Sequence, residues 1–321
     1  MVAYRHLILR TLLAGREVSG EEIAREIGVS RAMVHKEMAA MREEGLQVRA
    51  RPRRGYLLEA LPDRPLPWAV QAFYRPGEER PVRFLPEVSS TMEEAAAWAR
   101  ADAPEGAAVA TDHQVQGRGR RGRVWEDPPG ESLLASIVLR PRCTPAQAGW
   151  LPLAAAVGAS RAVERVCGIR AEIKWPNDLL LGQRKLAGIL VELTLDEMEI
   201  RHAVVGCGLN VHQENFAPQL RGMAVSLRQA AGYAGSRAPL LAALVEEISA
   251  AAAQMVDDPA ALRASWEKRS CTLGRQVVAH TAQGQIEGDA VAVDNLGRLI
   301  LHGAGGAVTA VSAGDVSIRW R

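Results

Sequence analysis

Gly117-Arg118-Gly119-Arg120-Arg121-Gly122-Arg123, followed by Val124-Trp125, is the stretch around which the rest of the chain is organised. Four arginines in seven positions exclude a core strand, because unpaired guanidinium groups are almost never fully buried. The three glycines allow positive φ angles and let a ligand approach the backbone closely. We therefore predict a mobile loop, rich in charge-assisted donors, that binds phosphate, carboxylate or nucleic acid. A solvated surface loop is the alternative.

The composition excludes several classes of protein. A length of 321 residues with 48% hydrophobic content predicts two or three domains with sizeable cores, and a net charge of +2 means that any basic surface is local. We find no signal peptide and no apolar run near the roughly 20 residues of a membrane span, and we expect a cytoplasmic protein without membrane contact. The four cysteines form no CxxC pair, which favours free thiols over a metal or redox site.

Residues 1–62 are predicted to form a winged helix-turn-helix domain. Ser19 and Ser30 are placed to cap two short amphipathic helices that flank a turn at Gly28. Two strand-like runs follow, with a basic hairpin tip between them. The first 60 residues hold 11 Lys and Arg against 8 Asp and Glu, which favours DNA binding; a winged helix used only for protein contacts is the alternative. The predicted DNA-binding residues are Ser30, Arg31, Ala32, His35, Lys36, Arg51, Arg53 and Arg54.

A proline-rich linker at residues 61–67 leads into a central domain. Its first strand ends at Ser89-Ser90-Thr91, where a helix begins, and an N-cap accounts for at least one of these hydroxyls. Further strands are predicted at residues 107–111, 132–139 and 201–211, and further helices at residues 151–166, 237–255 and 259–269. From residue 274 onward, short β runs separated by Gly and Asn predict a small all-β barrel of SH3-like size.

Three more motifs lie in the central domain. Lys174-Trp175-Pro176-Asn177-Asp178 ends a strand in a turn, and Lys185 begins a long apolar return strand. Gly206-Cys207-Gly208-Leu209-Asn210 lies within a strand, where glycines predict the close approach of a ligand or of a neighbouring element. This Gly-x-Gly opens no helix in a βαβ unit, which excludes a dinucleotide-binding fingerprint.

In this order, residues 117–123, 174–178, 185–192 and 206–210 closely resemble the motifs of the biotin–protein ligase family. With the winged helix in front and the small barrel behind, nearly the whole chain resembles a bifunctional biotin ligase and biotin-operon repressor. The resemblance implies an α+β fold in three domains. These are an N-terminal winged helix-turn-helix (residues 1–62), a central mixed β-sheet with helices, like that of class II synthetases (63–270), and a C-terminal SH3-like β-barrel (271–321).

The resemblance also implies a reaction in two steps. The carboxylate of biotin attacks the α-phosphorus of ATP to give biotinyl-5′-AMP and pyrophosphate, and a lysine of an acceptor domain then attacks the mixed anhydride. The first step joins two anions, so arginines, a lysine and Mg²⁺ would offset their repulsion. Closure of the loop would keep water from the anhydride. We expect no covalent enzyme intermediate.

The resemblance gives each motif a role. The predicted catalytic residues are Lys185, Arg118, Arg120 and Asp178. The predicted biotin contacts are Ser90, Thr91, Met92, Gln114, Arg118, Gly119, Arg120 and Lys185. The predicted contacts to ATP and the adenylate are Arg121, Arg123, Trp125, Lys174, Asn177 and Asn210.

Several of these roles stay open between alternatives. Asp178 could orient or deprotonate the incoming lysine, or help to hold Mg²⁺. Trp125 could stack near the adenine or anchor the loop, and Asn177 and Asn210 could be structural. Met92 departs from the family, which has a small polar amide after Ser-Thr. We expect the backbone N–H at this helix start to do the binding, which leaves the side chain free to vary.

The resemblance implies three partners: the biotin carboxyl carrier domain of acetyl-CoA carboxylase as acceptor, operator DNA of two-fold symmetry, and a second copy of the chain when the adenylate is bound. Three other functions compete. A regulator without catalysis would share the winged helix, and a lipoate ligase would share the central fold. A nucleic-acid arm at residues 117–123 would predict that Arg120→Gly weakens DNA binding and leaves adenylate retention untouched.

Overall fold

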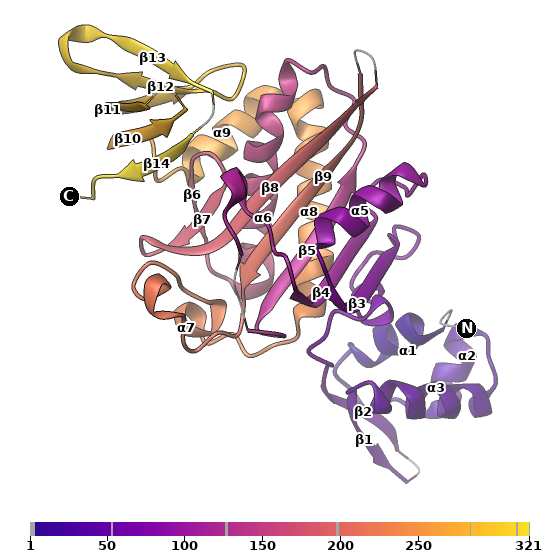
Figure 1. The fold of residues 1–321 in the computed structure, drawn as a ribbon. Coiled ribbons are helices and arrows are strands. Elements are labelled where there is room, and N and C mark those ends of the chain that lie inside the picture. Colours follow the sequence, from indigo (N-terminus) through magenta and orange to yellow (C-terminus); the bar gives the residue numbers. More distant parts are fainter. Residues whose placement is uncertain are drawn as a thin grey trace.

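The computed structural model describes residues 4–52, 54–125, 128–196, 199–282, 284–312 and 314–320. Three parts follow one another along the chain: a small helical unit at the N-terminus, a large central sheet, and a small sheet at the C-terminus (Figure 1). Of the residues predicted to bind DNA, Arg53 lies outside the described residues.

The N-terminal unit has the predicted helix-turn-helix with a β-hairpin. Its elements are α1 (Arg5–Leu12), α2 (Gly20–Ile27), α3 (Arg31–Glu43), β1 (Gln47–Arg51) and β2 (Gly55–Ala60). Ser19 Oγ accepts from the backbone N–H of Glu22 at 3.0 Å, and Ser30 Oγ accepts from that of Met33 at 3.2 Å. Both predicted caps therefore satisfy backbone donors at the helix starts.

The central sheet has seven strands in the order β3-β4-β5-β9-β8-β7-β6. Only the β3–β4 pair is parallel among these neighbours, so the sheet is mixed. The strands are β3 (Val82–Val88), β4 (Ala108–Gln114), β5 (Ser132–Leu139), β6 (Glu172–Lys174), β7 (Asp178–Leu181), β8 (Arg184–Asp196) and β9 (Glu199–Asn210). Strand β5 is buried along its whole length, as its mostly apolar sequence predicts.

Helices cover both faces of this sheet. α6 (Leu151–Cys167), α8 (Arg237–Asp257) and α9 (Pro259–Arg269) lie behind it in Figure 1, and α5 (Thr91–Arg100) lies in front. α6 and α8 pack closely because α6 is rich in alanine and carries Gly158, where a Cβ atom would lie 2.6 Å from the carbonyl oxygen of Glu247. Two short helices, α4 (Pro67–Gln71) and α7 (Leu227–Ala231), were not predicted from the sequence. Short 3₁₀ turns lie at Arg120–Gly122, Gln147–Trp150, Pro218–Leu220 and Ala304–Gly306.

Among the described residues, one helix is long and apolar enough to cross a membrane by length and composition. It is α8, with 21 residues, and 61% of its apolar window is buried inside the protein. The expectation that no apolar run nears this length was wrong for α8. Its packing against α6 and β5 identifies it as a core helix.

The C-terminal part is a five-stranded antiparallel sheet in the order β13-β12-β11-β10-β14. Its strands are β10 (Gln276–Thr281), β11 (Gly284–Val293), β12 (Leu299–His302), β13 (Val308–Val311) and β14 (Asp315–Ile318). Two buried indoles of the central domain donate to its backbone, Trp150 Nε1 to the carbonyl of Asp294 at 3.0 Å and Trp175 Nε1 to that of Gly297 at 3.1 Å. These bonds seat the small sheet beside the strands that carry the site.

Candidate active site

A cavity of about 830 Å³ opens on the face of the central sheet that carries α5. Its lining contains every residue predicted to bind biotin or ATP except Arg121: Ser90, Thr91, Met92, Gln114, Arg118, Gly119, Arg120, Arg123, Trp125, Lys174, Asn177, Lys185 and Asn210. Asp178 also lines it, and Asp315, Ile318 and Trp320 contribute from the C-terminal part. Some of these motifs lie more than 80 residues apart in the sequence, and the fold brings them together around this cavity.

A polar cluster lies where β3 ends and α5 begins. Gln114 Oε1 accepts from Thr91 N at 2.8 Å and from Thr91 Oγ1 at 3.0 Å, and Ser136 Oγ donates to Thr91 Oγ1 at 2.8 Å. Ser90 is the N-cap residue but makes no side-chain cap bond. Its hydroxyl is buried and has no partner within the described ranges. The expectation that capping uses one of these hydroxyls was wrong, since the Ser90 side chain makes no cap bond and the Thr91 hydroxyl bonds Gln114.

Met92 fills the space above a glycine of β9. A Cβ atom on Gly206 would lie 2.6 Å from Met92 Sδ, so the glycine makes room for this side chain. Met92 is 4% exposed and lines the cavity. Met92 therefore contributes an apolar wall to the polar end of the site, where the family has an amide.

Each arginine of the loop has a partner on a different element. Arg118 forms an ion pair with Glu93 on α5, and Arg120 Nη1 donates to Asn177 Oδ1 at 3.0 Å. The other two reach the C-terminal sheet: Arg121 Nη1 donates to the carbonyl of His280 at 2.9 Å, and Arg123 Nη2 donates to Asp315 Oδ2 at 2.5 Å. The loop predicted to be mobile is thus anchored at four points.

Arg120 is the most deeply placed of these arginines. Burial lowers the pKa of its guanidinium, and the charges of Arg121 and Arg123 act in the same direction against those of Asp315 and Asp178. An anionic ligand stabilises the charged form of a guanidinium that is partly desolvated and lies beside like charges. Arg121, in contrast, points out of the cavity to His280.

Lys185 and Asp178 form an ion pair across the β7–β8 hairpin, with 2.7 Å between Nζ and Oδ1. Asn210 holds the backbone at this point, because its Nδ2 donates to the carbonyls of Lys185 and Val225 at 3.3 Å and 3.2 Å. The amide of Asn177 is committed in a similar way, with Nδ2 donating to the carbonyl of Ile189 at 2.7 Å. Both asparagines therefore make structural hydrogen bonds.

Trp125 lies across the glycines of two neighbouring strands. A Cβ atom would lie 2.8 Å from its ring at Gly208 and 3.1 Å from it at Gly188. The ammonium of Lys185 lies 5.8 Å from the ring centroid, within reach of a cation–π contact. The indole N–H is buried without a partner among the described residues. The glycines predicted to permit a close approach thus make the floor on which this indole rests.

Cys207 belongs to the motif at residues 206–210 and lines the cavity. Burial raises the pKa of its thiol to about 12, so it stays protonated near neutral pH. A thiol in that state is a poor nucleophile.

The residues predicted to bind DNA lie on the winged helix and not near this cavity. Arg31, Ala32, His35 and Lys36 are exposed on α3, while Ser30 is occupied as its cap. Arg51 and Arg54 at the hairpin tip pair with Glu17 at 2.9 Å and 3.7 Å. An exposed basic helix face therefore accompanies a hairpin whose charges are partly neutralised.

Comparison with known proteins agrees with this geometry. Residues 84–210 match the biotin/lipoate A/B protein ligase family, residues 5–57 an HTH domain, and residues 272–319 the biotin protein ligase C terminal domain. The bifunctional ligase/repressor BirA of Bacillus subtilis is 33% identical over 298 residues, which cover 90% of each chain. The chain belongs to the biotin–protein ligase family. BirA of Escherichia coli is 31% identical over 315 residues, 98% of this chain and 97% of that one.

A solved relative in the family resembles most of this chain in structure. The biotin protein ligase of Aquifex aeolicus in complex with biotin and ATP superposes with a TM-score of 0.64 at 28% identity, covering 74% of this chain and 98% of that one. The N-terminal HTH unit and the three-part α+β fold agree with the fold class predicted from the sequence.

Sequence reasoning missed two carboxylates of the site and one of its walls. Glu93 and Asp315 hold the arginine loop from opposite sides, and Trp320 lines the cavity from the C-terminal end. Glu93 did carry a signal, since it lies two residues after Thr91 of the Ser-Thr motif, but it was interpreted only as an acidic first-turn residue. Nothing local to Asp315 indicated that its partner lies 192 residues away.

Proposed function

We propose that the chain catalyses the ATP-dependent formation of biotinyl-5′-AMP and the transfer of biotin to a lysine of a biotin carboxyl carrier domain, and that its winged helix represses biotin-synthesis genes. One observation carries the catalytic half: a single cavity contains two lysines, four arginines and a buried polar cluster with an unused hydroxyl. Such a site can hold two anions and a neutral, hydrogen-bonding ring at once.

In this proposal, the polar cluster binds the ureido ring of biotin. Ser90 Oγ has no partner within the described ranges, and Gln114 uses Oε1 for Thr91. The ring offers both donors and acceptors, which these groups can match. Met92 then packs against the apolar part of the ligand.

Lys185 and the arginines act on the reacting charges. Lys185, with Arg118 and Arg120, draws the carboxylate of biotin and the α-phosphate of ATP together and stabilises the charge that develops on the phosphoryl oxygens. A new bond forms between the carboxylate oxygen and the α-phosphorus while pyrophosphate leaves. Arg120 and Trp125 then retain the adenylate and exclude water from the anhydride.

Asp178 holds the ammonium of Lys185 in the cavity through their ion pair. Together with Asp315 it also supplies carboxylate oxygens, the ligand type that Mg²⁺ prefers. The described residues contain no group of three or more potential metal ligands, so Mg²⁺ would be shared with the phosphates of ATP, where it neutralises their charge. In the second step, the amine of the acceptor lysine attacks the carbonyl carbon of the anhydride and AMP leaves.

The catalytic half is tested by pyrophosphate release from the purified protein with ATP and Mg²⁺. Biotin is expected to stimulate release, and lipoate is not. Adding a carboxyl carrier domain is then expected to give a biotinylated product that depends on its acceptor lysine. Release that does not depend on biotin would overturn the assignment, and stimulation by lipoate alone would favour a lipoate ligase.

The repressor half rests on the exposed face of α3 and on the family of the chain. Arg31, His35 and Lys36 are in position to contact DNA. An adenylate-bound homodimer would match an operator of two-fold symmetry. A cytoplasmic location fits the four free cysteines.

A mobility-shift assay on the chain's own biotin-synthesis promoter region tests repression. Biotin with ATP is expected to strengthen the shift, and Lys36→Ala is expected to weaken it while leaving adenylate formation unchanged. A mobility shift that biotin and ATP do not change would contradict coupling between adenylate formation and DNA binding.

A further inference from the structure

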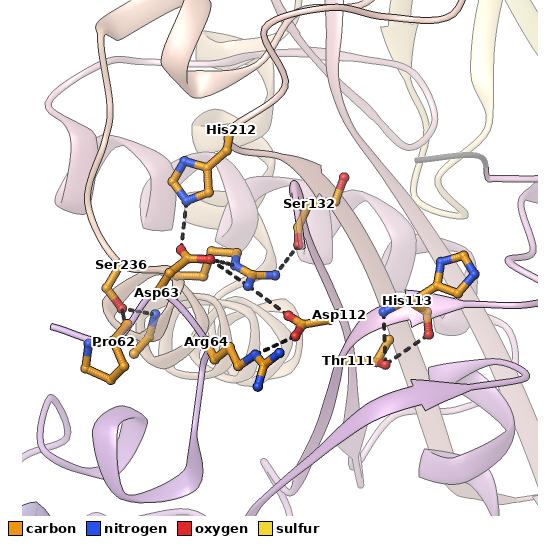
Figure 2. Close-up of polar contacts among 11 residues, drawn as sticks. Pro62, Asp63, Arg64, Thr111, Asp112, His113, Ser132, His212 and Ser236 are labelled. Carbon is orange, nitrogen blue, oxygen red and sulfur yellow. Dashed lines mark hydrogen bonds and ion pairs between the residues drawn. The ribbon is translucent and has the colours of Figure 1, made fainter. Parts of the chain in front are cut away.

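The linker behind the winged helix is bonded into the central domain at Asp63. Asp63 Oδ2 accepts from Arg237 Nε at 3.1 Å and Nη2 at 2.7 Å, and Asp63 Oδ1 lies 2.8 Å from His212 Nε2. The backbone is held too, because Arg237 N donates to the carbonyl of Asp63 at 3.0 Å and Ser236 Oγ to that of Pro62 at 2.6 Å. The proline-rich segment, predicted to be a linker or domain boundary, is thus bonded to the central domain (Figure 2).

Arg237 is the centre of this contact. It is 1% exposed, and besides Asp63 it binds Asp112 Oδ1 at 2.8 Å and the carbonyl of Ser132 at 2.9 Å. A buried guanidinium is tolerated only when carboxylates and carbonyls satisfy it. Burial raises the pKa of Asp63, but hydrogen bonding to His212 and the charge of Arg237 outweigh this and leave the pKa lowered. Asp63 is therefore ionised near neutral pH and completes the pairing of Arg237.

The other partners of Arg237 belong to strands of the site. Asp112 precedes Gln114 by two residues on β4, and Ser132 begins β5, which carries Ser136. Figure 2 shows Asp63, Asp112 and Ser132 converging on this point from the linker and the two strands. Loss of the charge at Asp63 would thus affect the positions of β4 and β5, which carry the polar cluster of the cavity.

From Ser132 the hydrogen bonds continue toward Lys185. Gln213 Nε2 donates to Ser132 Oγ at 2.5 Å and lies 3.4 Å from Asn210 Oδ1, and Asn210 Nδ2 donates to the carbonyl of Lys185. Gln213 is 2% exposed, so water does not interrupt the series. An unbroken run of bonds therefore joins the linker carboxylate to the backbone of the lysine proposed to act on both substrates.

We propose that Asp63 is a positioning residue for the ligase reaction: by fixing Arg237 it holds the ends of β4 and β5 and, through Gln213 and Asn210, the backbone of Lys185. The linker of the winged helix is then part of the support of the active site. Because coupling is reciprocal, the same contact lets occupancy of the cavity act on the linker. This inference rests on the proposed function.

The test uses the full-length protein and the Asp63→Asn variant, which keeps the shape and removes the charge. The matched control is Glu59→Gln, four residues earlier, because the partner of Glu59 among the described residues is Arg49 on the exposed hairpin. Biotin-dependent pyrophosphate release gives kcat and KM for biotin, and calorimetry gives biotin affinity of the folded protein. We expect Asp63→Asn to lower kcat/KM for biotin roughly tenfold, within the range of coupling through networks, and Glu59→Gln to change it less than about twofold.

Three further variants separate positioning from general stability. Gln213→Ala as a single variant should lower kcat/KM. The double variant Asp63→Asn/Gln213→Ala should be no less active than the less active of the two single variants, because both substitutions interrupt the same series of hydrogen bonds. Asp63→Glu, which keeps the charge, should recover part of the activity even if Asp63→Asn folds poorly. Additive losses, or equal kinetics for Asp63→Asn and Glu59→Gln, would overturn the inference. A wild-type protein without biotin-dependent release would instead overturn the proposed function.

Discussion

Arginine–carboxylate pairs occur in two regions of this molecule, and they differ in burial. At the loop, Arg118 and Glu93 are 48% and 43% exposed, and Arg123 and Asp315 are 70% and 23% exposed. At the linker, Arg237 is 1% exposed and contacts two carboxylates. An exposed pair contributes about 0–1 kcal/mol, so a ligand can replace one partner at small cost. A buried charge cannot lose its partner without a large penalty, so the linker pairs hold the structure.

The largest expected effect breaks the buried contact. Arg237→Met should lower the free energy of unfolding by about 3 kcal/mol, the lower end for a broken buried pair, because Asp112 keeps its pair with Arg64 and the half-exposed Asp63 keeps its contact with His212. The control Arg123→Met removes an exposed pair and should cost less than about 1 kcal/mol. Chemical denaturation measures both. Equal losses in the two variants would remove the distinction between the regions.

The next effect concerns the loop and should leave stability unchanged. Arg120→Gly removes a charged donor to the adenylate, worth about 1.5–3 kcal/mol, and should speed adenylate dissociation roughly 10–100-fold. Release of labelled adenylate from the protein measures this rate. Unchanged release, combined with weaker DNA binding, would support the nucleic-acid arm.

A smaller effect concerns pH. The pKa of Asp63 is lowered in the folded protein, so its contribution to stability is complete above the unfolded pKa of about 3.9 and is lost as pH falls through the lower folded value. Asp63→Asn should therefore lose less stability than the wild type when the pH falls from about 5 to about 2. Denaturation curves over this range make the comparison, and parallel losses would show that Asp63 does not contribute.

The smallest effect concerns the pair between α5 and the loop. Glu93→Gln frees Arg118 from an exposed partner, so biotin should bind slightly more tightly, by no more than about fivefold. Titration calorimetry with biotin measures this change. A marked loss of affinity would mean that Glu93 orients Arg118 and does not compete for it.

Local chemistry made much of the fold predictable. Ser19 and Ser30 cap their helices as expected, and α9 spans the predicted residues 259–269. The composition of the arginine loop and of the glycines of β9 predicted ligand contact or close packing, whereas the role of Lys185 was predicted only from the family resemblance.

Long-range pairing could not be predicted in this way. Asp63 lies in a proline-rich run, and its partner Arg237 follows 174 residues later, so no local pattern links the two. Ser90 has the sequence of an N-cap but keeps its hydroxyl free of any cap bond, because the tertiary contacts around Thr91 and Gln114 decide the local bonding. Trp125 rests on Gly188 and Gly208 only because β8 and β9 are neighbours in the sheet.

Lys185 is proposed to act with the arginine loop on two anions in one cavity. Single-turnover formation of biotinyl-5′-AMP by Lys185→Gln tests it most directly, with denaturation curves to show that the variant is folded. Removal of such a donor to developing charge is expected to slow adenylate formation roughly 100–1,000-fold while the protein remains as stable as the wild type. A rate within about threefold of the wild type would contradict the account.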